Sequence, residues 1–162
     1  MSLASNTLTA RRDTTATTLA RRIANNRDLW EPYVRFDAER RWYGRLPVDG
    51  NCEVWLLTWL PGQRTGIHDH GGSAGAFAIA AGSLQETVAH GSLDSPRLRV
   101  AHYCAGAVRP FGKSHIHDVG NVDDVPAVSV HVYEPSLTQM TRYRLYGGRL
   151  HVTEHDRAGA AW

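Results

Sequence analysis

The feature that most constrains the fold is a series of short, closely spaced strand-like segments that begins after Tyr43. Each segment is rich in β-branched, aromatic or aliphatic residues and lies near Gly or Pro, a pattern typical of strands joined by tight turns. The expected strands cover residues 52–59, 66–70, 75–81, 83–90, 97–104, 114–119 and 127–135, and two more flank Gly147–Gly148, a glycine pair that suits a hairpin turn. So many short strands in 162 residues predict one mainly β domain, a small barrel or double-sheet sandwich.

The first forty residues are expected to form a helical lead-in. Thr17 or Thr18 is the expected helix cap, and the helix should end near Asn25–Asn26. Its apolar face carries Leu19, Ile23 and Leu29. We therefore expect a single domain in which residues 1–40 pack as helices on a barrel of residues 41–162. The Arg-, Ser- and Thr-rich start has no apolar core and does not resemble a secretory signal.

Charge and cysteine content argue against several classes of protein. The formal net charge of +2 is small and dispersed, so nothing favours a nucleic-acid partner. No apolar run reaches the length needed to cross a bilayer, so no membrane partner is expected. Cys52 and Cys104 are too few for a disulfide framework, and we expect reduced thiols in a cytoplasmic protein.

Two His-x-His pairs, His68 with His70 and His115 with His117, are the candidates for chemistry. Side chains alternate along a strand, so His68 and His70 should point to one face and Asp69 to the other. Two imidazoles on an inward face suit a transition metal better than an apolar core. A single such pair is a weak signal in a chain with nine histidines, and the surrounding spacing has to support it.

That spacing resembles the first motif of the cupin superfamily. Gly62, His68, His70 and Gly82 lie where the motif has its glycines and histidines, but Gly75 stands where the motif has a glutamate ligand. The fold implied is a cupin, a small double-sheet β-barrel, whose metal strand lacks its carboxylate. Small residues from 71 to 75 would leave room beside the metal.

A third histidine is expected from a second cupin-like motif after the turn at residues 110–112. His117 keeps the His-x-x-x-Asn ending with Asn121, whereas His115 fits the generic spacing from the turn better. We favour His117 and keep His115 as the alternative. Glu86 lies on the strand that follows Gly82, where we expect it to form a salt bridge.

Four segments make the resemblance more specific, and through them the chain resembles a bacterial cysteine dioxygenase of the thiol dioxygenase family. The segments are YGR (43–45), TWLPGQRTGIHDHGGSAGAFAIAAGSLQET (58–87), HDVGN (117–121) and AVSVHVYEP (127–135). The resemblance implies one mononuclear Fe(II) per chain, held by His68, His70 and His117. A substrate thiolate would then supply the anionic ligand that the missing glutamate does not.

The same resemblance assigns the supporting residues. Ser129, His131 and Tyr133 alternate on one face of their strand and correspond to a relay in which Ser129 holds His131 and His131 holds the Tyr133 hydroxyl. Arg45 would bind the substrate carboxylate, with Tyr43 lining the same pocket. Animal enzymes carry a cysteine at the position of Gly75 and join it to the tyrosine. Here Tyr133 should stay a free phenol, as in a bacterial subtype.

The reaction implied is the conversion of L-cysteine and O₂ to cysteine sulfinic acid. A 3-mercaptopropionate dioxygenase is the alternative within the class, although its members commonly have Gln in place of the arginine at 45. A non-catalytic cupin that binds a metal or small molecule as a sensor is the alternative from another class. A zinc-dependent isomerase would ordinarily retain the carboxylate ligand. The expected partners are a small thiol and O₂, and the expected state is a monomer, with weak homo-oligomerisation possible.

Overall fold

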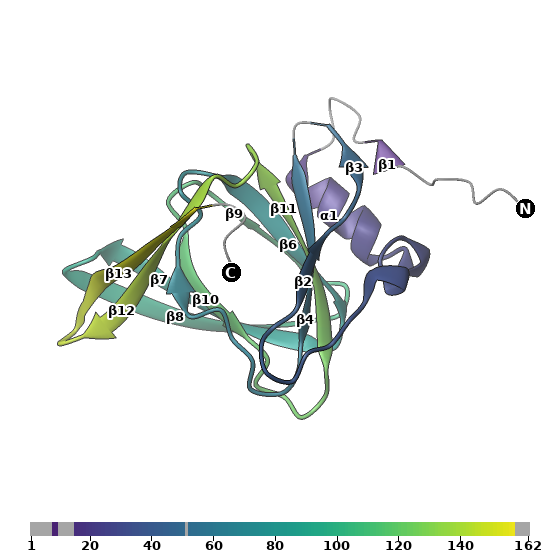
Figure 1. The fold of residues 1–162 in the computed structure, drawn as a ribbon. Helices are drawn as coiled ribbons and strands as arrows, with labels where there is room; N and C mark the ends of the chain where they lie inside the picture. Colours follow the sequence, from purple (N-terminus) through teal and green to yellow (C-terminus); the bar gives the residue numbers. More distant parts are fainter. Residues whose placement is uncertain (1–7, 10–14, 51, 158–162) are drawn as a thin grey trace, which may run out of the picture.

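The computed structural model describes residues 8–9, 15–50 and 52–157 and shows two antiparallel sheets that face each other as the walls of a barrel (Figure 1). In strand order, the first sheet contains β13 (Arg149–Arg157), β12 (Gln139–Tyr146), β5 (Ile67–His68), β10 (Ile116–Gly120), β7 (Ser83–Ser92) and β8 (Ser95–Cys104). The second contains β2 (Tyr43–Arg45), β4 (Glu53–Trp59), β11 (Ala127–Glu134), β6 (Ala74–Ala81) and β9 (Val108–Phe111). A short parallel pair joins β1 (Leu8–Thr9) to β3 (Val48–Asp49). The mainly β prediction is confirmed.

Helix α1 (Ala16–Ala24) lies against the outside of the second sheet (Figure 1). Its cap is Thr15, whose hydroxyl oxygen accepts a hydrogen bond from the Thr18 amide at 3.2 Å. The expected cap at Thr17 or Thr18 was wrong, because both residues already lie inside the helix. The helix ends at Asn25 as expected. Two short 3₁₀ turns follow, η1 (Arg27–Leu29) and η2 (Glu31–Tyr33).

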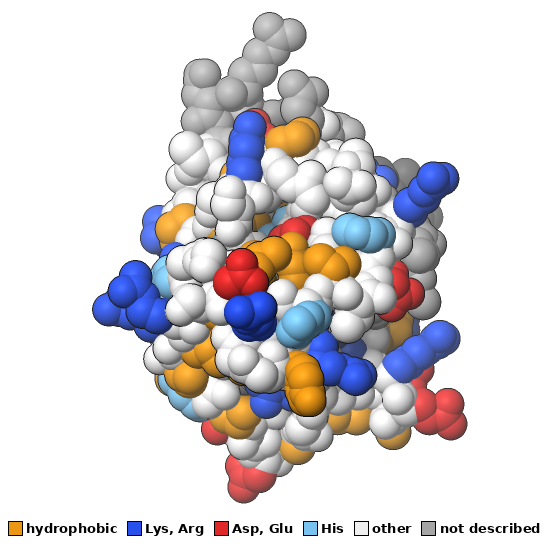
Figure 2. Space-filling model, turned by 90° about the vertical axis from the view of Figure 1, so that its left-hand side faces the viewer, with side chains coloured by type: hydrophobic (Ala, Val, Ile, Leu, Met, Phe, Trp, Pro, Cys, Tyr) orange, Lys and Arg blue, Asp and Glu red, His pale blue; other side chains and the backbone are white. Residues whose placement is uncertain are grey.

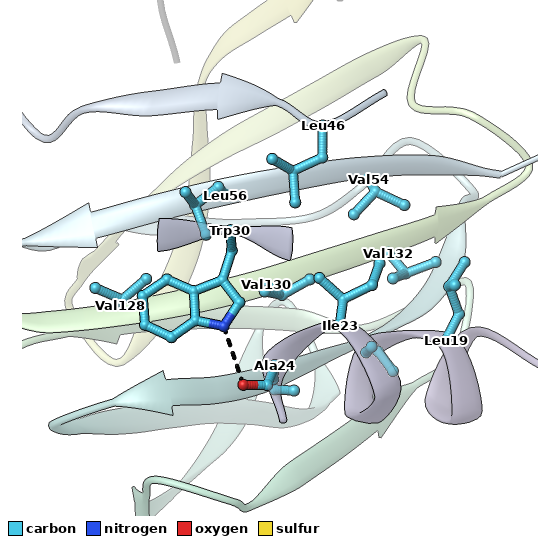
Figure 3. Close-up of a cluster of buried hydrophobic side chains, with 13 residues drawn as sticks. Leu19, Ile23, Ala24, Trp30, Leu46, Val54, Leu56, Val128, Val130 and Val132 are labelled. Atoms are coloured by element: carbon cyan, nitrogen blue, oxygen red, sulfur yellow. Dashed lines mark hydrogen bonds between the residues drawn. The ribbon is translucent and has the colours of Figure 1, made fainter. Parts of the chain in front are cut away.

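The helix buries its apolar face on the valines of β11 (Figure 3). Leu19 and Ile23 pack toward Val130 and Val132, and the Trp30 indole N–H donates to the Ala24 carbonyl at 3.1 Å, which fastens the turn after the helix. Burying side chains of this size stabilises the fold by about 1.5–3 kcal/mol each. The valine face of β11 is thus used for packing, which leaves the opposite face of the strand for the barrel interior.

The barrel interior forms a second core, to which both sheets contribute. Trp59, Phe77 and Ile79 come from the second sheet, and Leu84 and Val119 come from the first. Strand β9 was not predicted, because Pro110 obscured it. It forms the edge of its sheet, where a proline without an N–H is tolerated. The predicted hairpin between β12 and β13 is confirmed, and Gly147 and Gly148 both have positive φ.

The face formed by the β7–β8 and β12–β13 hairpins carries basic, acidic, histidine and apolar side chains interspersed over its surface (Figure 2). No helix in the described part of the chain has the length and apolar character required to cross a bilayer.

Candidate metal centre and substrate pocket

Three histidines converge inside the barrel. His68 is in β5, His70 follows it, and His117 is in β10, where strand pairing sets it directly opposite His68. One ring nitrogen from each histidine lies within 4.8 Å of the others. All three side chains are buried, with exposed fractions of 3%, 1% and 1%. The structure thus brings together the three residues that the sequence suggested as ligands.

Hydrogen bonds fix the orientation of two of these rings. The Nδ1–H of His68 donates to the Gly66 carbonyl at 2.9 Å, and the Nδ1–H of His117 donates to Oε1 of Glu86 at 2.7 Å. Both rings therefore keep Nε2 free for a metal. Burial lowers the pKa of all three histidines, so the rings are neutral, the form that binds metals. The residues fit a transition-metal ion bound by three imidazoles.

Glu86, on β7, is fully buried beside His117 and has three partners. It accepts hydrogen bonds from His117, from His115 Nε2 at 2.8 Å and from Arg109 Nε at 3.0 Å. Burial favours its neutral form, but the hydrogen bonds from the two histidines outweigh burial and lower the pKa of Glu86. The salt bridge expected for Glu86 is present, with Arg109. Its bond to His117 was missed, although a prediction that β7 pairs with β10 would have indicated it.

His115 and His117 therefore differ in what they contact. His115 points its Nε2 at Glu86, and its ring centroid lies 6.5 Å from that of His70. The His117 ring lies 4.7 Å from His68 and 5.0 Å from His70. Glu86, His115 and His117 also form a possible ligand group, but there the Nδ1 of His117 is already engaged by the carboxylate.

Asp69 faces away from the triad, as strand alternation predicts, and anchors the histidine loop. Its Oδ1 accepts from the amides of Gly71 at 2.9 Å and Thr141 at 3.1 Å, and its Oδ2 accepts from the Tyr143 hydroxyl at 2.7 Å. These bonds tie the loop that carries His68 and His70 to β12.

The space around Gly75 differs from the expectation that small residues leave room there. A Cβ at Gly75 would overlap the backbone carbonyl of Val132 and would lie 2.8 Å from Cζ of Phe111. Gly75 pairs with Tyr133 across the sheet, so β6 and β11 already occupy the position where a cupin glutamate would begin. A side chain at this position would therefore require the paired strands to move, and the expected room does not exist at Gly75.

A pocket lies beside the triad, and Tyr133 connects the two. The Tyr133 ring centroid is 5.3 Å from that of His70, and the side chain is buried. Burial raises the pKa of Tyr133, so the phenol is neutral. The other lining residues are Arg41, Tyr43, Trp55, Leu57, Thr65, Leu137 and Met140. The wall is mostly apolar, with one cation.

Behind Tyr133, Ser129 and His131 form a buried hydrogen-bonded chain. The Trp59 indole N–H donates to Ser129 Oγ at 2.9 Å, and Ser129 Oγ lies 2.9 Å from His131 Nε2. The Ser129–His131 contact has the form that the sequence suggested. The His131 and Tyr133 rings are 6.4 Å apart between centroids, and the action of His131 on the Tyr133 hydroxyl stays a prediction.

Arg45 is the expected site residue that the structure does not bring to this pocket. Its side chain is 62% exposed, and its Nη1 lies 3.7 Å from Oε1 of Glu53. Tyr43 does line the pocket, and the arginine that accompanies it is Arg41. Arg41 was not singled out from the sequence, where it is one arginine among several near the start of β2.

The fold and this site define a cupin-type protein, a double-stranded β-helix with three buried histidines placed to hold a metal ion. Residues 11–145 match the family model described as cysteine dioxygenase type I. The chain belongs to the cysteine dioxygenase type I family. It is 29% identical to human cysteine dioxygenase type 1 over 117 residues, which cover 65% of this chain and 56% of the human protein. The chain thus spans about half the length of the curated relatives that it matches.

Solved structures of other proteins share the fold. Protein TT1209 of Thermus thermophilus superposes with a TM-score of 0.57 at 21% identity, covering 65% of this chain and 93% of that protein. A Klebsiella pneumoniae protein with a double-stranded β-helix domain superposes with a TM-score of 0.55 at 20% identity, covering 65% of this chain and 80% of that protein.

Proposed function

We propose that this protein is a mononuclear non-haem Fe(II) thiol dioxygenase that converts L-cysteine and O₂ to cysteine sulfinic acid. The observation that carries the proposal is the buried triad of His68, His70 and His117, which has neutral rings and no carboxylate ligand among the described residues. Membership of the cysteine dioxygenase family supports the reaction class.

The donor set suits a ferrous ion whose remaining positions receive the substrates. Three neutral imidazoles leave the charge of the ion uncompensated, so an anionic thiolate is favoured as the next ligand. A ferrous ion held there would bind the thiolate and dioxygen and promote their reaction. Two S–O bonds form, the O–O bond breaks and sulfur gives up four electrons, so the reaction balances without an external reductant.

The residues of the chain would position and protect the reactants. Trp55, Leu57 and Met140 give the pocket a mostly apolar wall, which would limit the access of water to bound substrates. Tyr133, kept neutral by burial, holds a hydroxyl proton that it can donate in a hydrogen bond to an oxygen atom of the substrates. Ser129 holds His131, which we propose supports Tyr133 from behind. Cys52 and Cys104 are free thiols, in keeping with the reducing cytoplasm that we propose as the compartment.

A second candidate substrate is 3-mercaptopropionate. The sequence favoured cysteine over 3-mercaptopropionate because of Arg45, and the exposed position of that side chain removes this reason. The amine of cysteine is the only group that distinguishes the two thiols, and both carry a carboxylate.

Oxygen consumption by the Fe(II)-loaded protein tests the proposal, with cysteine and 3-mercaptopropionate compared in parallel and the products identified by mass. We expect one O₂ per cysteine sulfinate formed. Preferred use of 3-mercaptopropionate would retain the mechanism and change the substrate. Stoichiometric iron without oxygen uptake from either thiol would contradict the enzyme and favour a non-catalytic binding domain.

A further inference from the structure

An acidic side chain is buried at the start of β4, on the face of the strand that lines the pocket. Strand alternation puts Glu53, Trp55 and Leu57 on one face, and the last two belong to the pocket wall. Glu53 lies directly opposite Tyr133 in the pairing of β4 with β11, and it is only 7% exposed. A carboxylate in such a place is costly unless it is hydrogen-bonded, so its partners indicate what it does.

Both oxygen atoms of this carboxylate are engaged. Oε2 of Glu53 accepts a hydrogen bond from the Leu137 amide at 2.9 Å, and Oε1 lies 3.7 Å from Nη1 of Arg45. The Arg45 side chain is 62% exposed, so water screens this pair and weakens it. The bond to the Leu137 amide is buried and charge-assisted, which makes it the stronger of the two contacts.

Leu137 belongs to the segment 135–138, which connects β11 to β12. The other residues of this segment are exposed or half-buried, whereas Leu137 is 6% exposed and lines the pocket together with Met140. Within the described part of the chain, the bond to Glu53 is the one hydrogen bond that any residue of the segment makes. The position of Leu137 in the wall therefore depends on Glu53.

The pocket is small enough for this position to matter. Its volume is about 40 Å³, a few times the space that one water molecule needs. Adding a methyl group to a ligand that fills such a site requires the wall to move. Leu137 lies in a connecting segment and not in a strand, so it is the part of the wall that would move most easily if it were released.

We propose that Glu53 is a positioning residue that holds residues 135–138 against the pocket through the Leu137 amide, and so limits the site to thiols no bulkier than cysteine. The choice of thiols as ligands rests on the proposed function, whereas the restraint on the Leu137 amide does not require turnover. The role needs a hydrogen-bond acceptor, so glutamine, whose side-chain oxygen also accepts, should largely replace Glu53.

The first test is hydrogen exchange at the Leu137 amide, measured by NMR on the metal-free protein. Glu53→Ala should speed this exchange about 10- to 100-fold, as expected for the loss of a buried hydrogen bond to a charged group. Glu53→Gln should restore most of the protection. Glu134→Ala removes an exposed carboxylate next to the same segment and should match the wild type.

The second test compares two thiols that differ in bulk, by isothermal titration calorimetry under anaerobic conditions with Fe(II)-loaded protein. L-Penicillamine is L-cysteine with two methyl groups added beside the sulfur. The wild type should prefer cysteine by about tenfold or more, and Glu53→Ala should abolish most of this preference, whereas Glu53→Gln should keep it. Leu137→Ala, which shortens the wall but keeps the amide, should also reduce the preference. It provides an independent check if Glu53→Ala does not fold.

Several outcomes would overturn the proposal. Equal exchange at Leu137 in the wild type and Glu53→Ala would do so, as would an unchanged preference for cysteine in Glu53→Ala or Leu137→Ala. Losses in Glu53→Gln as large as those in Glu53→Ala would show that the charge matters and not the acceptor, which also contradicts it. Protein that shows both expected effects but consumes no O₂ with cysteine would contradict the proposed function and leave the role of Glu53 intact.

Discussion

Glu86 and His117 are joined by a 2.7 Å hydrogen bond from the imidazole Nδ1–H to the carboxylate Oε1, between two paired strands of one sheet. The bond sets the tautomer of His117 and increases the basicity of Nε2. The negative charge of Glu86 can be buried here because the carboxylate also accepts hydrogen bonds from Arg109 and His115.

Replacing Glu86 with glutamine should therefore weaken metal binding without removing a ligand. The neutral amide cannot stabilise the His117 ring as the carboxylate does, and we expect the affinity for Fe(II) to fall about 10- to 100-fold. An anaerobic competition titration with a chelator measures it. Glu154→Gln, at an exposed position of β13, is the matched control and should bind as the wild type does. Equal affinity in the Glu86 and Glu154 variants would refute the orienting role.

The choice between His117 and His115 gives a second prediction. His117→Ala should abolish stoichiometric Fe(II) binding, because two imidazoles remain where three converge. His115→Ala removes a partner of Glu86 and should retain binding of one iron per chain, with at most a modest loss of affinity. Metal analysis after gel filtration distinguishes the two. Retained iron in the His117 variant and lost iron in the His115 variant would transfer the third ligand to His115.

Much of this site could be predicted from spacing along the chain, because strand alternation is a local rule. This rule predicted that His68 and His70 lie on one face of their strand and Asp69 on the other. It also predicted that Ser129, His131 and Tyr133 share one face of β11. The valines that alternate with these three residues in β11 form the opposite face, which packs on α1.

Features that depend on which strands lie side by side could not be predicted in the same way. The pairing of β7 with β10 brings Glu86 to His117, and nothing in either segment alone specifies that neighbour. Arg41 and Arg45 are four residues apart, so strand alternation puts them on the same face and cannot tell which of them lines the pocket. That depends on Glu53, which holds Arg45 at the exposed rim, and on Trp59, whose ring packs against the Arg41 guanidinium.

Gly75 leads to a prediction about stability. Gly75→Ala should destabilise the protein by about 1–3 kcal/mol, because the new methyl group would overlap the Val132 carbonyl in a strand paired on both sides. Urea denaturation of the metal-free protein measures the change in the free energy of unfolding. Gly112→Ala is the control, since a Cβ there would meet nothing within 4 Å. Similar stability of the two variants would show that β11 can shift and that Gly75 is not required by packing.

The contact between Tyr143 and Asp69 predicts how stability depends on pH. Burial, followed by the hydrogen bond to Asp69, raises the pKa of Tyr143 to about 12. The folded state therefore retains a phenolic proton that the unfolded chain, with an ordinary tyrosine pKa of about 10, has already lost. This contribution to stability is complete below pH about 10 and is lost as the pH rises through about 12.

Urea denaturation between pH 8 and 12 checks this, comparing the wild type with Tyr143→Phe. At pH 8 the variant should be less stable by about 1 kcal/mol, since it lacks the hydrogen bond that anchors the histidine loop. Towards pH 12 the difference should shrink, because the wild type loses the proton that phenylalanine never had. Tyr146→Phe, at a side chain that is 76% exposed, should follow the wild type throughout. A constant difference between wild type and Tyr143→Phe across this range would mean that Tyr143 titrates alike in the folded and unfolded states, and that Asp69 does not hold its proton.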